Sequence, residues 1–225
     1  MCYKGIFRPF PPMPNTYASA IYEIAEPRNG YFTMAQAKVA GIRPNAVVKM
    51  AQRGIIERIS RGVYRVVNFP PFRHGQLMEA SLWPYDGVPG VISHESALRL
   101  HELSDVSPAK VHITLPSDHR VRRAVPPYLV VHHAELPATD VEILDGIPVT
   151  TPCRSIVDGH AAHLGTDLIR QAIDDGRRSG RLTAREAEQL RAALIEKNAP
   201  DGAAPPDPTP RSRTPRPRTP RPRTL

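Results

Sequence analysis

The sequence has few of the features that mark membrane-bound or disulfide-stabilised proteins. Its 225 residues include two cysteines, Cys2 and Cys153, and the first lies in a loose terminal segment. A structural disulfide is therefore not expected, and a reducing cytoplasm suits such a chain. No apolar run is long enough for a signal peptide or a membrane span. These absences predict a cytoplasmic protein without a membrane partner.

The sequence also lacks the short motifs of common catalytic and cofactor sites. It has no phosphate-binding glycine loop, no nucleophile elbow and no nuclease-like Asp followed by Glu-x-Lys. Its nine histidines show neither Cys-x-x-Cys nor His-Glu-x-x-His spacing. His132 and His133 should face opposite sides of a strand, whereas His94 and His101 could share a helix face. We predict packing and surface hydrogen bonds for these histidines, with no metal, no cofactor and no catalytic residue.

Acidic residues are scarce in one segment of the chain. Residues 31–66 hold seven Lys or Arg against one acid, Glu57, which gives a net charge of +6. Residues 67–200 hold 14 basic and 17 acidic side chains, a net −3, and residues 201–225 carry +4. Basic segments on either side of an acidic body favour a polyanionic partner, with nucleic acid the first choice. The alternative from charge alone is a protein of high pI without such a partner.

Composition divides the chain into four segments. Residues 1–15 are a proline-rich irregular arm, and residues 201–225 are a Pro/Arg-rich tail that cannot form a core and should be disordered. We interpret the tail as solvated chain without a specific role; the alternative is a nonspecific electrostatic arm on nucleic acid. Between these ends we predict a DNA-binding domain at 16–68 and an α+β domain at 75–200.

Residues 16–68 carry the helix and turn signals of a winged helix. Apolar spacing predicts a first helix, a capping box begins a second helix at Thr33, and a third helix runs from Pro44 to Gly54. Two alternating apolar runs around a Ser-Arg-Gly turn then predict a hairpin. Three helices and a basic hairpin form the winged-helix order, in which the third helix enters the major groove and the hairpin meets the DNA backbone.

This module supplies the candidate DNA contacts. Asn45, Lys49 and Gln52 share the outer face of the third helix, where Asn and Gln can pair with adenine and Lys can reach guanine. The surrounding arginines would mostly clamp phosphates. The full set of DNA-binding candidates is Lys38, Arg43, Asn45, Lys49, Gln52, Arg53, Arg58, Arg61 and Arg65. The alternative is a solvated amphipathic helix beside a charged edge strand that resists aggregation.

The rest of the chain predicts helices bracketing a small mixed sheet. Strands are expected at 110–116, 127–136, 140–144 and 147–150, and helices at 74–83, 93–103, 151–164, 166–179 and 183–198. Helix caps are expected at Ser93, Thr151 and Thr183, and Asp145-Gly146 should form a hairpin turn. The predicted fold class is α+β: a winged helix-turn-helix, then an α+β domain, then the disordered tail.

Five segments, in this order, resemble a known family. They are GYFTMAQAKVAGI, RGIIERISRGVYRV, VISHESALRLHEL, VHITLP and DGIPVTTPCRSIVD, and they lie between Tyr17 and Asp158. Together they resemble the AbiEi-type antitoxins of bacterial type IV toxin–antitoxin systems. The proline arm and the Arg-rich tail depart from that pattern, so the resemblance implies no role for them.

The resemblance implies a winged-helix repressor that binds inverted repeats in its own operator DNA. It also implies an α+β domain that counters a nucleotidyltransferase toxin, with or without a stable complex. The two segments most like the family contain the antitoxin-domain candidates Ser93, His94, Glu95, Arg99, Arg154 and Asp158. Their alternative role is structural, with Ser93 and Glu95 at a helix start and Arg154 paired to Asp158. The competing function is a nucleic-acid- or nucleotide-processing enzyme that uses the His-bearing domain.

Overall fold

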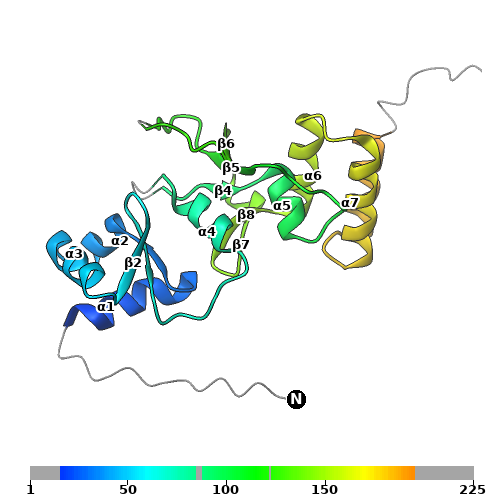
Figure 1. The fold of residues 1–225 in the computed structure, drawn as a ribbon. Coiled ribbons are helices and arrows are strands. Elements are labelled where there is room, and N and C mark those ends of the chain that lie inside the picture. The colour runs from blue at the N-terminus through cyan, green and yellow to red at the C-terminus, as the bar shows by residue number, and fades with distance from the viewer. Residues whose placement is uncertain (1–15, 85–87, 122, 196–225) are drawn as a thin grey trace, which may run out of the picture.

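The structure is a computed structural model that describes residues 16–84, 88–121 and 123–195. The arm predicted at 1–15 and the tail predicted at 201–225 lie outside the described residues. Figure 1 shows the helices of the N-terminal module at one end of the molecule, a central sheet, and a group of helices at the other end. The predicted fold class, α+β with a small mixed sheet, is confirmed for the described residues.

The N-terminal module combines three helices with a three-stranded sheet. Its elements are α1 (Thr16–Ala25), η1 (Glu26–Arg28), β1 (Tyr31–Thr33), α2 (Met34–Val39), α3 (Pro44–Gln52), β2 (Ile56–Ser60) and β3 (Val63–Val66). The sheet order is β1-β3-β2, and both pairings are antiparallel. Strand β1 follows α1 and pairs with the second strand of the hairpin, which ties the hairpin to the helices. This is the winged-helix topology.

Local signals set the boundaries of these helices. The predicted capping box is present, because the Thr33 side chain accepts from the Gln36 amide and the Gln36 side chain accepts from the Thr33 amide. Helix α3 begins with Pro44, whose missing N–H would have no partner in the first turn. After it, Gly54 adopts a φ of +69°, a left-handed conformation that glycine reaches without strain.

The C-terminal part is built on a mixed five-stranded sheet. Its strands are β4 (Val91–Ile92), β5 (Val111–Leu115), β6 (Leu129–His133), β7 (Val141–Leu144) and β8 (Ile147–Thr150), in the order β6-β5-β4-β8-β7. The β4–β8 and β5–β6 pairs are parallel, and the β4–β5 and β7–β8 pairs are antiparallel. A short 3-10 helix, η2 (Ala138–Asp140), precedes β7. The predicted hairpin turn at Asp145-Gly146 is present.

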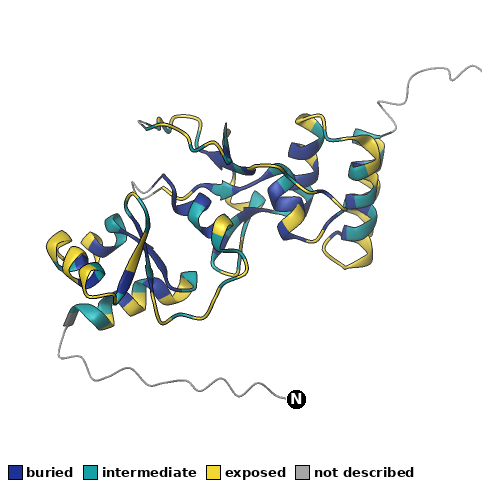
Figure 2. Cartoon of the chain, viewed as in Figure 1, coloured by how far each residue is buried: buried dark blue, intermediate teal, exposed yellow. Residues whose placement is uncertain are grey.

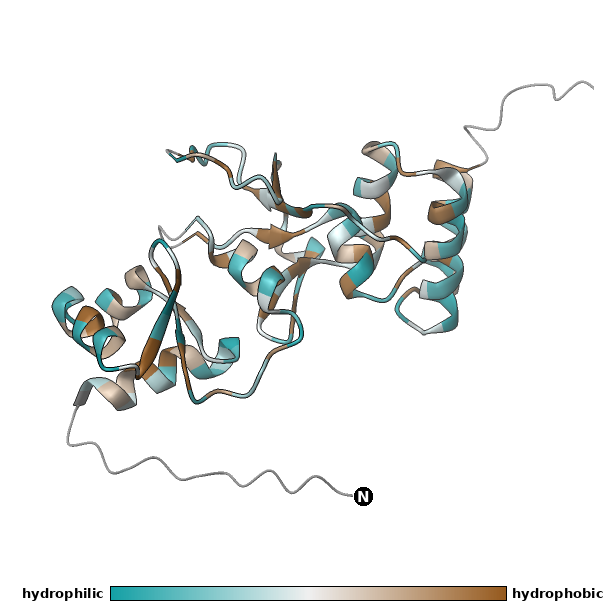
Figure 3. Ribbon diagram, viewed as in Figure 1, coloured by the Kyte–Doolittle hydropathy of each residue, from teal (hydrophilic) through white to brown (hydrophobic). Residues whose placement is uncertain are grey.

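Helices cover this sheet and extend beyond it. They are α4 (Gly75–Leu82), α5 (His94–Leu100), α6 (Pro152–Ala161), α7 (Thr166–Arg178) and α8 (Ala184–Leu194). The helices α5 to α8 share a core around Leu98, Ile156, Ile169, Ile173 and Leu190, all buried. Figures 2 and 3 show buried and hydrophobic residues concentrated in the central strands, with exposed and hydrophilic residues on the outer helices.

Hydrophobic contacts link the N-terminal module to the C-terminal sheet. Tyr31 and Val63 of the small sheet belong to one buried cluster with Met78, Ile113 and Val149. Helix α4 lies within this contact, since it touches β1 on one side and β4, β5 and β8 on the other. Because this cluster includes residues of both segments, the structure alone does not divide the chain there, and the separately folding domains at 16–68 and 75–200 stay a prediction.

Two short strands and two caps differ from the sequence predictions. Strands β1 and β4 were not predicted, because strands of three and two residues carry too little alternation to be recognised. Ser93 and Thr151 occupy N-cap positions, but neither side chain makes a capping hydrogen bond. The cap predicted at Thr183 is correct, since Thr183 and Glu186 form a complete capping box.

The described part of the chain contains no candidate membrane-spanning helix. Among residues 16–84, 88–121 and 123–195, no helix is both long enough and apolar enough to cross a bilayer.

Candidate functional site

The outer face of α3 is polar and accessible. Val47 and Met50 of this helix are buried against the core of the module, whereas Asn45, Lys49 and Gln52 are exposed. This is the division that the sequence predicts from helical spacing. The exposed turns of α3 lie at the end of the molecule farthest from α7 (Figures 1 and 2).

A cleft runs along α3 toward the start of α1. Its volume is about 690 Å³, and its lining combines one aromatic ring with polar and basic side chains. The lining residues are Tyr17, Arg43, Pro44, Asn45, Ala46, Lys49, Met50 and Arg53. The structure therefore brings four of the predicted DNA contacts around one hollow, while Gln52 lies exposed outside it.

Most of the basic residues in this module have no acidic partner. Among the described residues, Arg65 is the one member of the seven in segment 31–66 that forms an ion pair, with Glu57 at 3.4 Å. Lys38, Arg58 and Arg61 are exposed on the same module, and Arg61 lies in the turn of the hairpin. Positive charges without an acidic partner remain available to a polyanion.

Arg65 differs from the other predicted DNA-contacting arginines in its burial and its partners. Its side chain is only 14% exposed. Its guanidinium donates to the carbonyls of Phe69 at 3.0 Å and Pro70 at 2.7 Å, and it lies 5.5 Å from the centre of the Tyr31 ring. Arg65 therefore fixes the chain that leaves β3. The prediction that it clamps a phosphate is not supported by this geometry.

A second polar region lies where α5 follows β4. Ser93 is buried, and its hydroxyl accepts from Thr114 at 2.8 Å while lying 2.9 Å from Nδ1 of His94. These contacts occupy the hydroxyl that was predicted to cap α5. His94 has a φ of +53°, a left-handed conformation that is uncommon for a residue with a side chain.

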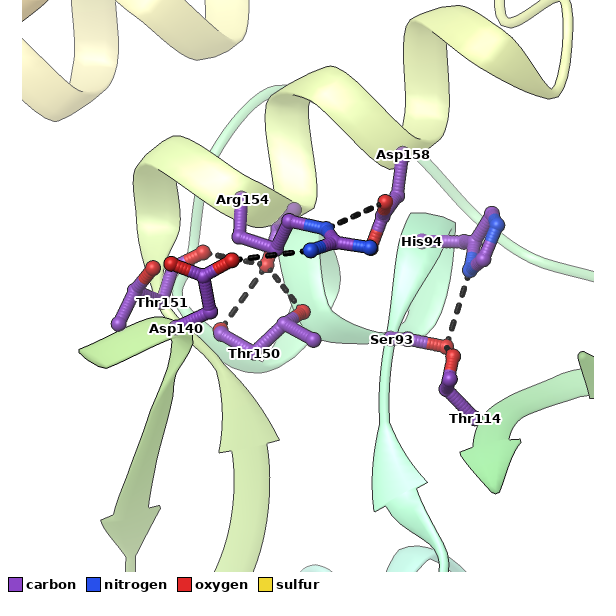
Figure 4. A network of polar contacts seen from close by, with 9 residues as sticks. Ser93, His94, Thr114, Asp140, Thr150, Thr151, Arg154 and Asp158 are labelled. Carbon is purple, nitrogen blue, oxygen red and sulfur yellow. Dashed lines mark hydrogen bonds and ion pairs between the residues drawn. The ribbon is translucent and has the colours of Figure 1, made fainter. Parts of the chain in front are cut away.

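Arg154 on α6 forms ion pairs with two aspartates, one on α6 and one on η2. Its Nε donates to Asp158 at 2.7 Å and its Nη1 donates to Asp140 at 2.9 Å, so the predicted Arg154–Asp158 pair is present with a further partner. Figure 4 shows Arg154 between these carboxylates, and Ser93 between His94 and Thr114. Oδ2 of Asp158 is buried and has no hydrogen-bond partner within the described structure.

Three histidines converge beside this network. The rings of His94 and His132 stack with centroids 3.7 Å apart, and Nδ1 of His112 lies 3.1 Å from Nε2 of His132. Burial, with the neighbouring histidines and Arg154, lowers the pKa of His94 to about 3. Burial also lowers the pKa of His112 and of His132. All three rings are therefore uncharged at neutral pH.

The other candidates lie outside this cluster. Glu95 is partly buried and Arg99 is exposed, and neither forms a hydrogen bond or an ion pair with the cluster among the described residues. His101 is buried, and its Nε2 lies 2.7 Å from the carbonyl oxygen of Thr150.

Sequence reasoning missed His112, Thr114 and Asp140 as partners of the predicted residues. The alternation of β5 places His112 and Thr114 on one face, and this pattern is visible in the sequence. The pairing of Thr114 with His132 is not visible, because it depends on the parallel register of β5 and β6.

The order of three helices, an intervening strand and a basic hairpin defines a winged-helix protein whose third helix has a polar, basic outer face. Residues 19–67 match the family model described as "Transcriptional regulator, AbiEi antitoxin", so this module is similar to that family over those residues. The predicted resemblance is confirmed over those residues. The family is one of regulatory antitoxins rather than enzymes.

Comparison with curated proteins finds no match. Among solved structures, the crystal structure of the RV2827C protein from Mycobacterium tuberculosis is similar, with 16% sequence identity and a TM-score of 0.45. The similarity covers 80% of this chain and 72% of that one.

Proposed function

We propose that this protein is an antitoxin and repressor that binds operator DNA of its own operon and counters a nucleotidyltransferase toxin. The observation that supports the DNA-binding half is the polar face of α3, bordered by basic residues without acidic partners. The AbiEi-type module supports the antitoxin half through its family.

Helix α3 would lie in the major groove of the operator. Its three exposed polar side chains, Asn45, Lys49 and Gln52, can each form hydrogen bonds with base edges. Arg43 and Arg53 lie at the two ends of the helix and line the same cleft, so they would contact the flanking phosphates. Inverted repeats in the operator would be bound by two copies of the chain, one on each half-site.

The hairpin would hold the adjacent DNA backbone through Arg58 and Arg61. We expect Arg61→Ala to weaken binding to operator and random duplex alike, because a phosphate contact carries no base information. The slope of log affinity against log salt should fall by about one unit. Binding titrations at several salt concentrations measure both effects.

Arg185→Ala is the matched control for this experiment. It removes an equal charge from an exposed position on α8, distant in sequence from the hairpin. Its binding curves should coincide with those of the unmodified chain. An unchanged salt slope in Arg61→Ala would remove the hairpin from the proposed interface.

Neutralisation of the toxin would depend on residues 75–200, which carry the cluster of Ser93, His94, Arg154 and Asp158. This part has a net charge of −3 over 67–200 and is a poor DNA surface, so repression and neutralisation should be separable.

A test of separability should use the full chain, because the buried cluster of Tyr31 and Val63 crosses the predicted boundary. We expect a chain with Asn45, Lys49 and Gln52 all changed to Ala to lose repression of a promoter reporter. The same chain should still rescue growth when the proposed nucleotidyltransferase toxin is co-expressed. Loss of rescue at an equal protein level would show that DNA binding and neutralisation share one surface.

A further inference from the structure

We propose that His94, His112 and His132 form a binding site for one divalent transition-metal ion, with Zn²⁺ the best-suited ion. Each residue offers one ring nitrogen, and these three nitrogens all lie within 4.8 Å of one another. The residues come from the first position of α5 and from the neighbouring strands β5 and β6. The fold therefore assembles three imidazoles that are far apart in sequence.

The closest two nitrogens already have nearly the spacing that a metal requires. Two nitrogens bound to one tetrahedral Zn²⁺ at about 2.0–2.1 Å lie roughly 3.3–3.4 Å apart. Nδ1 of His112 and Nε2 of His132 are 3.1 Å apart. The third nitrogen, from His94, lies within 4.8 Å of both others, and its ring stacks on that of His132.

The surroundings of His94 favour one ligating atom. Its Nδ1 lies 2.9 Å from the Ser93 hydroxyl, which Thr114 holds from the other side at 2.8 Å. Nδ1–H can donate to that oxygen, which leaves the lone pair of Nε2 for the ion. Metal-bound histidines commonly have such a partner on the other ring nitrogen. The left-handed backbone of His94 is a local strain that this placement of the ring would explain.

The electrostatics of the cluster also suit a cation. The carboxylate of Asp158 acts on His132 and favours positive charge there. Its Oδ2 is buried and has no hydrogen-bond partner among the described residues, so this oxygen is free to accept a hydrogen bond from a group that coordinates the ion.

Three imidazoles leave one position of a tetrahedral ion open, so water or an external donor would complete the coordination. The ion would also link α5 to β5 and β6. Bound metal should therefore stabilise the folded chain, raising the Tm by about 5–10 °C at a hundred-fold excess of free Zn²⁺ over the Kd.

The experiment is equilibrium dialysis of the untagged full chain against buffered Zn²⁺, with the metal content measured by mass spectrometry. We expect one equivalent per chain. His112→Asn and His132→Gln place an amide near the contacting ring nitrogens, so they can keep the hydrogen bond but supply a poor metal ligand. Each should weaken Zn²⁺ binding by roughly a hundred-fold or more.

His133→Ala is the matched control, because His133 adjoins His132 but is exposed. It should retain one equivalent of metal. His132→Cys should also retain one equivalent of metal. With Co²⁺ in place of Zn²⁺, this variant should show the strong absorption of a thiolate–cobalt bond. A merely structural role for His132 would not produce that absorption. Metal content that is equal in His112→Asn, His132→Gln and the unmodified chain would overturn the proposal, as would its absence from the unmodified chain.

Discussion

A chain in which Asn45, Lys49 and Gln52 are all replaced by Ala should bind its operator and a random duplex with nearly equal affinity. These three side chains are exposed on the outer face of α3 and make no contribution to the buried core of the module. Each bidentate contact with a base supplies about 1–3 kcal/mol of discrimination. Their joint loss should reduce the preference for operator by roughly a hundred-fold or more.

Competition binding at fixed salt measures this preference directly. The Tm should stay within about 2 °C of the unmodified chain, since surface substitutions of this kind change stability little. Arg177→Ala, which removes one positive charge from an exposed site on α7, is the control for the lost charge of Lys49. If selection from randomised duplexes returns the same motif with the triple variant, sequence recognition lies elsewhere on the protein.

The sequence was sufficient to predict the winged helix because its boundaries depend on local chemistry. The capping box at Thr33, the proline at Pro44 and the left-handed Gly54 each act within a few residues of their own position. Outward placement of Asn45 and Lys49 follows from helical spacing alone. Such features need no knowledge of the rest of the fold.

Arg65 and Ser93 show where that reasoning fails. The partners of Arg65 are carbonyls that approach only after the chain turns back beyond β3. Ser93 has the sequence context of a helix cap, but Thr114 of a neighbouring strand holds its hydroxyl instead. For Ser93 a tertiary partner replaced the local one, whereas the partners of Arg65 lie four and five residues further along the chain.

The histidine cluster depends entirely on strand register. His112 and His132 are diagonal neighbours on β5 and β6, because Thr114 pairs with His132 in a parallel ladder. A shift of one residue would turn His133 toward the cluster and His132 away from it. Spacing along the chain therefore could not reveal this site, and the sequence-based prediction considered only neighbours within one element.

Gly146→Ala should destabilise the protein by several kcal/mol, about 2–5 kcal/mol in total. Gly146 has a φ of +80°, and a Cβ at this position would lie 2.1 Å from the carbonyl oxygen of Pro27. Beside it, the Asn29 side chain donates to the Asp145 carbonyl at 2.9 Å. The turn between β7 and β8 therefore docks closely against η1 of the N-terminal module.

Two costs should add in this variant. A left-handed conformation costs an alanine about 1–2 kcal/mol, and overpacking against a backbone atom that cannot rotate away costs about 1–3 kcal/mol more. Gly180→Ala separates them, because Gly180 has a φ of +74° but no atom lies within 4 Å of the position that its new methyl group would take. Urea unfolding of both variants should show the larger loss for Gly146→Ala, with operator affinity of the folded protein retained. Equal losses in the two variants would mean that the docked turn contributes nothing to holding the winged helix on the sheet.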